Sequence, residues 1–101
     1  MANAISLSDF TSQIIDNNEE LKSALEKFSQ RISEKYNAKI LFCELYGKRW
    51  SYLAGSEEDF ATKQRYKIND FYGIIYEKRK FRDNEIREII DLSENIIEKL
   101  S

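Results

Sequence analysis

The sequence predicts an α+β domain in which a four-stranded antiparallel sheet is flanked by long amphipathic helices. Two observations support this prediction. An apolar stripe with helical spacing lies at each end of the 101-residue chain, and between the stripes the pattern changes to dense apolar runs divided by turn residues. The length fits a single domain, residues 1–101, built around one hydrophobic core.

An N-terminal helix is expected over about residues 8–36. Apolar residues recur at intervals of three or four along most of Leu7–Ile32, as on one face of a helix. The polar cluster at residues 16–18 interrupts this stripe, so we expect a break or kink there, with Asn18 capping the second segment. Ser8 is the expected N-cap of the first segment.

A first hairpin is expected over about residues 38–54. Gly47-Lys48 provides a two-residue loop with glycine first, as a type II′ turn requires. The loop predicts three cross-strand pairs that share one face, which we expect to be the core face: Leu45 with Trp50, Cys43 with Tyr52, and Leu41 with Ala54.

A short helix is expected over about residues 57–64, because Ser56 followed by three acidic residues is typical of a helix start. It would connect to a second hairpin over about residues 65–78. Asn69-Asp70 is its expected type I′ loop, since both residue types tolerate positive φ.

A C-terminal helix is expected over about residues 83–100, with Asp83 or Asn84 as its N-cap. Its isoleucines and final leucine fall on one stripe, which indicates an amphipathic helix packed by a single face. The order of elements is therefore helix, two strands, short helix, two strands, helix.

The composition argues against catalysis, metal binding and bound cofactors. The chain has no histidine, and its one cysteine, Cys43, lies in an apolar run that indicates a buried, inert thiol. The three glycines are isolated rather than grouped into a phosphate-binding loop. The chain begins without a signal-peptide pattern and contains no apolar run of membrane-spanning length, so we expect a non-enzymatic cytoplasmic protein without a membrane partner.

Three groups of residues are candidates for function. Aromatic residues and the cysteine in the hairpins would line a small-ligand pocket: Cys43, Trp50, Tyr52 and Tyr72. Apolar residues of the terminal helices either pack inside one chain or form a homodimer or partner interface: Leu7, Phe10, Ile14, Leu21, Ile89, Ile96 and Ile97. A basic cluster is either a solvated turn or, as the less favoured interpretation, a nucleic-acid contact: Lys78, Arg79, Lys80 and Arg82.

The stretch RYKINDFYGIIYEKRKFRDNEIREIIDLSENIIEKL resembles the C-terminal part of GAF domains. In that family a hairpin ends in a glycine and aliphatic strand residues, here Gly73-Ile74-Ile75, and a phenylalanine and acidic cap, here Phe81 and Asp83, begin the last helix. GAF domains are usually longer, and only residues 55–65 stand where their ligand-covering segments lie. The chain lacks a cysteine placed for bilin attachment and a histidine for haem, so the resemblance implies a fold and a tendency to dimerise.

The leading hypothesis is a small regulatory module, similar to a minimal GAF domain, that forms a homodimer and binds a protein partner or a small ligand. The alternative is a small acidic adaptor or chaperone that receives a peptide of a partner protein. A third interpretation, a nucleic-acid-associated protein, depends on the basic turn at residues 78–82.

Overall fold

The computed structural model describes residues 6–56 and 63–101, and it confirms the α+β fold. Within these residues the helices are α1 (Leu7–Asp16), α2 (Leu21–Tyr36) and α3 (Asp83–Leu100), with one 3₁₀ turn, η1 (Lys78–Lys80). The strands form one antiparallel sheet in the order β2-β1-β4-β3: β1 (Ile40–Tyr46), β2 (Arg49–Gly55), β3 (Lys63–Lys67) and β4 (Tyr72–Glu77).

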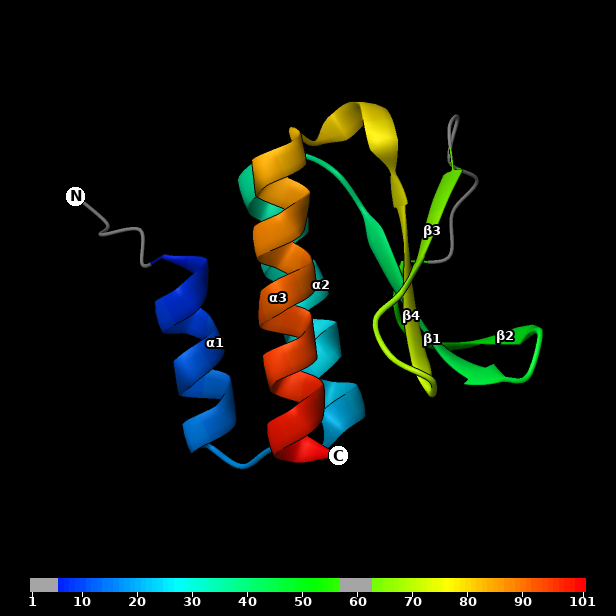
Figure 1. Ribbon diagram of the computed structural model, residues 1–101. Coiled ribbons are helices and arrows are strands. Elements are labelled where there is room, and N and C mark those ends of the chain that lie inside the picture. The colour runs from blue at the N-terminus through cyan, green and yellow to red at the C-terminus, as the bar shows by residue number, and fades with distance from the viewer. Residues whose placement is uncertain (1–5, 57–62) are drawn as a thin grey trace.

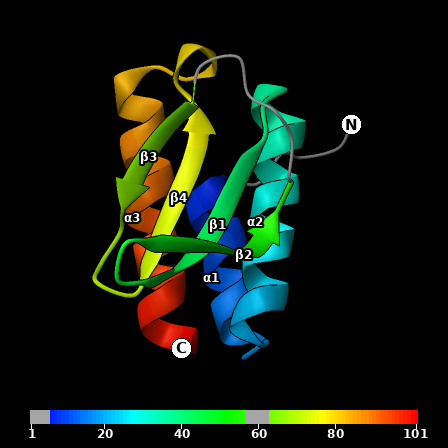
Figure 2. The same ribbon diagram turned by 90° about the vertical axis from the view of Figure 1, so that its right-hand side faces the viewer.

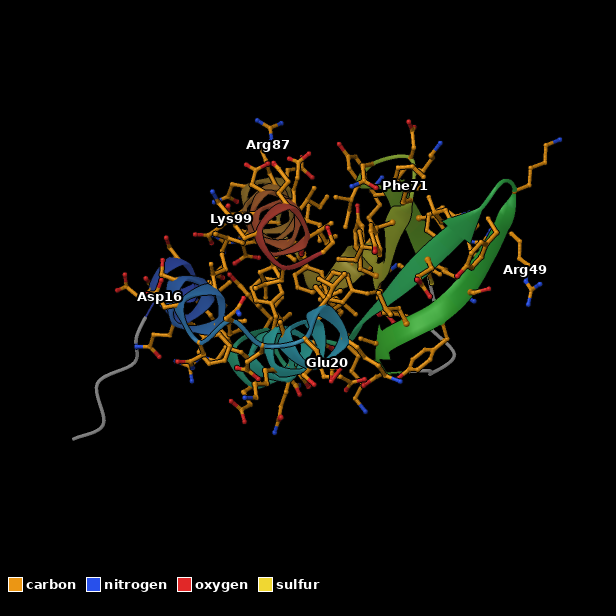
Figure 3. The ribbon with its side chains drawn as sticks, turned by 90° about the horizontal axis from the view of Figure 1, so that it is seen from below. Asp16, Glu20, Arg49, Phe71, Arg87 and Lys99 are labelled. Atoms are coloured by element: carbon orange, nitrogen blue, oxygen red, sulfur yellow. The ribbon has the colours of Figure 1, made fainter. Side chains whose placement is uncertain are left out.

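The described elements are arranged in three layers. Helices α2 and α3 lie side by side against one face of the sheet, and α1 lies on their far side (Figures 1 and 3). The opposite face of the sheet carries no helix of the described part of the chain, and it is the face turned toward the viewer in Figure 2. The hydrophobic core therefore occupies the space between the sheet and the helices.

The expected break in the N-terminal helix is confirmed, but the capping residues differ. Asn18 adopts a left-handed conformation with φ 51°, so it follows the end of α1 rather than capping α2. Glu20 occupies the N-cap position of α2. At the other end of α1 the cap is Ser6 instead of Ser8, because Ser6 Oγ accepts a hydrogen bond from the Asp9 N–H at 3.1 Å.

Helix α3 has the expected bounds, and here too the cap shifts by a residue. Arg82 is the N-cap, and its N–H donates to Glu85 Oε1 at 2.8 Å. Asp83 is then the first helical residue, where its negative charge still interacts favourably with the helix dipole.

The first hairpin has the expected turn and part of the expected register. Gly47 has φ 64°, and Leu45 pairs with Trp50 as Cys43 does with Tyr52. A β-bulge then shifts the register, so that Ala54 pairs with Phe42 instead of Leu41. The bulge moves Ala54 to the opposite face of the sheet from Trp50 and Tyr52.

The expected core face of this hairpin is wrong. The core shared with the helices contains Ile40 and Phe42 of β1, together with Ala54, Ile74 and Tyr76 of the neighbouring strands. Cys43 and Leu45 point to the helix-free face and are buried there as well. Because β1 is a central strand that is apolar on both faces, alternation could not show which face meets the helices.

The second hairpin also departs from expectation. The predicted helix at residues 57–64 lies mostly outside the described residues, and its last two positions, Lys63 and Gln64, belong to β3. The expected type I′ loop is wrong, since neither Asn69 nor Asp70 has positive φ. Asn69 Oδ1 instead accepts the N–H groups of Phe71 and Tyr72 at 2.8 and 2.9 Å, and this side chain organises the turn.

Trp50 covers the helix-free face of the sheet. From β2 its ring reaches across β1 to Gly73 of β4, where an added Cβ atom would lie 2.3 Å from the indole. Arg65 of β3 lies over the same ring, with its guanidinium carbon 5.3 Å from the ring centroid. One side chain therefore contacts or approaches all four strands. Cys43 is buried on the same face.

We predict that Gly73→Ala displaces Trp50 and destabilises the fold by about 1–3 kcal/mol, the usual cost of overpacking. Because Trp50 is the only tryptophan, its emission should shift to longer wavelength in the folded variant. Denaturant unfolding followed by fluorescence and by circular dichroism measures both effects.

Gly47→Ala is the matched control. It introduces a strained positive φ with nothing within 4 Å of the new Cβ atom, so it should destabilise without shifting the Trp50 emission. A double-mutant cycle with Trp50→Leu should remove most of the cost of Gly73→Ala. An unchanged cost in the Trp50→Leu background would contradict this account of Gly73.

Candidate functional site

Strand β3 forms an open edge of the sheet. Within residues 6–56 and 63–101 it pairs with β4 alone, and all five of its residues are exposed. The Ile68 N–H donates to the Tyr72 carbonyl at 2.9 Å, so these two residues form a hydrogen-bonded pair. In an antiparallel hairpin every second pair along the strands is hydrogen-bonded in this way. The backbone groups of Tyr66 and Gln64 then face β4. Those of the alternate residues face outward: Lys63, Arg65 and Lys67.

A groove of about 320 Å³ runs between this edge and α3. Tyr66, which is 47% exposed, and the buried Tyr76 contribute from the sheet. Ile86 and Ile90 contribute from successive turns of α3, and both are half-buried. Figure 2 shows β3 at the edge of the sheet in front of α3, which places the groove along the side of the molecule.

Charged residues of α3 form the outer rim of the groove. Asp83, Arg87 and Asp91 recur at intervals of four residues, so they follow one side of the helix. In Figure 3 Arg87 projects from α3 on the same side of the molecule as Phe71 in the β3–β4 turn. The floor of the groove is therefore apolar and aromatic, and its helical rim carries two carboxylates and one guanidinium.

The groove offers apolar and aromatic surface and one neutral tyrosine hydroxyl. Burial raises the pKa of Tyr76 above 10.0, and the charges of Asp83 and Tyr66 act in the same direction, so its hydroxyl is neutral and can donate a hydrogen bond at neutral pH. Among the described residues no group of three or more histidine, cysteine or acidic side chains is placed to hold a metal ion. No described helix is long and apolar enough to cross a membrane.

The structure does not bring the four expected pocket residues together. Cys43, Trp50 and Tyr52 lie on the helix-free face, whereas Tyr72 pairs with Glu44 on the helix side. Burial raises the pKa of Tyr72, with a smaller contribution from the Glu44 charge. These four residues therefore do not line a common cavity.

Tyr52 instead helps to fasten the other edge of the sheet to α2. Its hydroxyl lies 2.9 Å from the Gly55 carbonyl oxygen and 3.2 Å from Glu26 Oε1, and it can donate to either acceptor. The Gly55 N–H donates to the same Glu26 oxygen at 3.2 Å. The end of β2 is thus held by α2, in contrast to the open edge at β3.

The helical residues expected at an interface lie mainly inside one chain. Five of the seven are buried in the core: Leu7, Ile14, Ile89, Ile96 and Ile97. Phe10 and Leu21 are half-buried and pack against that core. Helix α1 packs on α2 and α3 and buries this apolar surface within one chain. Burial of these residues therefore does not require a second copy.

The basic cluster forms one exposed connection between β4 and α3. Lys78, Arg79 and Lys80 make up η1, and Arg82 is the N-cap of α3. All four side chains are exposed. This arrangement fits a solvated turn.

Sequence reasoning missed the residues that make the groove. The sequence pattern gives no sign that Tyr66, Ile86 and Ile90 share a groove, and it marks Asp83 only as a helix cap. One signal was present in the sequence, since KQRYK places cations at every second position, as on one face of a strand. Comparisons with protein-family models, curated proteins and solved structures found no match.

We predict that the protein loses stability at alkaline pH through three tyrosines that are buried or half-buried. Burial raises the pKa values of Tyr36, Tyr72 and Tyr76 above 10.0. In the unfolded chain these phenols ionise near pH 10, whereas the native state retains their protons. Their contribution to stability is complete below about pH 10 and is lost as pH rises through the native pKa values.

Phenolate absorbance of the native protein, combined with thermal unfolding at successive alkaline pH values, measures this effect. Tyr36, Tyr72 and Tyr76, each identified by its Tyr→Phe variant, should ionise above pH 10 in the folded protein. Ionisation of these three residues near pH 10 in the folded protein would contradict the prediction.

Proposed function

We propose that this protein is a small, non-enzymatic interaction module that binds an extended segment of a partner protein along β3. The observation that carries the proposal is the open edge of β3 beside an apolar groove. It corresponds to the peptide-binding adaptor or chaperone that the sequence suggests as an alternative to a GAF-like module. The regulatory role and the resemblance to GAF domains remain predictions.

The backbone of β3 would supply affinity. Lys63, Arg65 and Lys67 each direct one N–H and one C=O away from β4, so a segment lying alongside can continue the hydrogen-bonding ladder of the sheet. Recognition by strand addition combines such main-chain hydrogen bonds with pockets for alternate side chains.

The groove would supply selectivity. Side chains of an added strand alternate between the two faces of the sheet, so every second one would point toward the helix side, where Tyr66 and α3 form the groove. Ile86 and Ile90 offer half-buried apolar surface, and the neutral Tyr76 hydroxyl offers one hydrogen-bond donor. An apolar side chain of the partner fits this lining.

Homodimerisation is a separate prediction that the mass of the protein in solution tests directly. The helical residues expected at its interface are mostly buried in one chain, so they leave little apolar surface for a second copy. A charged substitution at Ile97 would be a poor test, because it would place a charge in the core.

We predict that heptapeptides selected from a random library on the full chain bind at the groove. Tyr66→Ala should weaken their binding about tenfold or more, because it removes an aromatic anchor. Tyr46→Ala is the matched control, since Tyr46 is also an exposed tyrosine but lies at the tip of the first hairpin. Fluorescence anisotropy of labelled peptides measures both affinities, and equal effects of the two variants would contradict the assignment.

We also predict that Lys67→Pro abolishes binding of the same peptides, whereas Lys67→Ala largely retains it. Proline removes an outward N–H without breaking a hydrogen bond to β4, so the edge is blocked while the sheet remains paired. Circular dichroism verifies that both variants fold. If the folded proline variant bound as well as the alanine variant, strand addition at β3 would be excluded.

A further inference from the structure

We infer that the segment bound along β3 is acidic at every second residue and apolar at the residues between, and that it is not β3 of a second copy. This inference rests on the proposed function, because it concerns the chemistry of the partner at the same edge. It is carried by the distribution of charge on the two faces of β3 and α3.

The helix-free face of β3 presents a row of three cations. Lys63, Arg65 and Lys67 alternate with Gln64 and Tyr66, so their side chains share one face and lie about 7 Å apart along the strand. All three are exposed. On an added strand, the side chains directly opposite this row would lie within about 5.5 Å at Cβ, where opposite charges stabilise the pairing and like charges oppose it.

Arg65 already packs on Trp50 without a partner. Its guanidinium lies over the Trp50 ring, which limits the conformations of a side chain that would otherwise be mobile. A carboxylate that pairs with Arg65 would therefore meet a preoriented cation, which reduces the entropy lost on binding. Because Trp50 is the only tryptophan, its fluorescence also reports occupancy of this edge.

A second copy cannot supply the complementary strand. The outward backbone groups belong to Lys63, Arg65 and Lys67, so two antiparallel copies would pair through these residues. In the centred register Arg65 faces Arg65 of the other copy and Lys63 faces Lys67, and shifted registers again oppose cation to cation. The edge thus carries the charges that natural sheets use against self-pairing.

On the side of the groove, the partner's side chains are expected to be apolar rather than acidic. Asp83, Arg87 and Asp91 lie on its rim, which therefore carries one net negative charge, and Ile86 and Ile90 contribute to its lining. An acidic side chain directed into the groove would meet apolar surface and a rim of net negative charge, whereas an apolar side chain would be buried. A one-residue slip would reverse the two sets of side chains, so the charges also fix the register of the partner.

The test uses three blocked synthetic peptides with the same apolar residues: EVEVEVE, SVSVSVS and KVKVKVK. The acidic peptide should bind about tenfold or more tightly than the neutral one, and the basic peptide should be weakest. The advantage of the acidic peptide should shrink as ionic strength rises from about 0.05 to 0.5 M, because salt screens exposed charges. Trp50 fluorescence and isothermal titration calorimetry measure the affinities.

Charge reversal provides the matched variant. Arg65→Glu should weaken EVEVEVE and strengthen KVKVKVK. Arg49→Glu, which changes another exposed arginine, on β2, should leave the order of the peptides unchanged. Lys67→Pro should abolish binding of EVEVEVE while Lys67→Ala reduces it only in part. Circular dichroism verifies folding of each variant.

The outcomes separate this inference from the proposed function. If the three peptides bound equally and Lys67→Pro abolished the binding of all three, the proposal of strand addition would stand and the acidic preference would be overturned. Failure of these peptides while library-selected peptides bind would also overturn it, and failure of both sets would overturn the proposed function itself. If an oligothymidine bound more tightly than EVEVEVE and Lys67→Pro did not affect its binding, the ligand would be a nucleic acid and the acidic segment would be overturned.

Discussion

The packing of Trp50 across Gly73 is the contact on which the remaining structure depends. The described helices cover only one face of the sheet, yet both central strands are apolar on both faces. The indole closes the second face by reaching over β1 to β4, and Arg65 extends this cover to β3. The absence of a side chain at Gly73 provides the space for the ring.

The two edges of the sheet differ because only one of them is tied to a helix. Glu26 of α2 accepts the Gly55 N–H, and the Tyr52 hydroxyl lies against both groups, so the end of β2 is fixed. Strand β3 lacks an equivalent bond to α3 among the described residues, and the groove lies in its place. The functional proposal follows from this asymmetry between an anchored edge and an open one.

Helix α1 explains why most of the apolar surface of the terminal helices is buried within one chain. Helix α1 packs on α2 and α3 from the side opposite the sheet, with Leu7 and Ile14 buried among them (Figure 1). The break at Asn18 makes this packing possible, because a continuous helix could not fold back on itself. The short polar break between α1 and α2 thus allows the apolar residues of α1 to be buried against α2 and α3.

The sequence by itself determined the number and type of the main elements, because periodicity, Gly47 and the polar break at residues 16–18 act locally. The alternation of cations along β3 can also be read from the sequence. Tertiary structure alone decided which face of β1 meets the helices, since both faces are apolar and the bulge before Ala54 depends on pairing with β2. The groove also forms only in the tertiary structure. Tyr66 and Ile90 are distant in sequence, and they line one groove only when the sheet packs against α3.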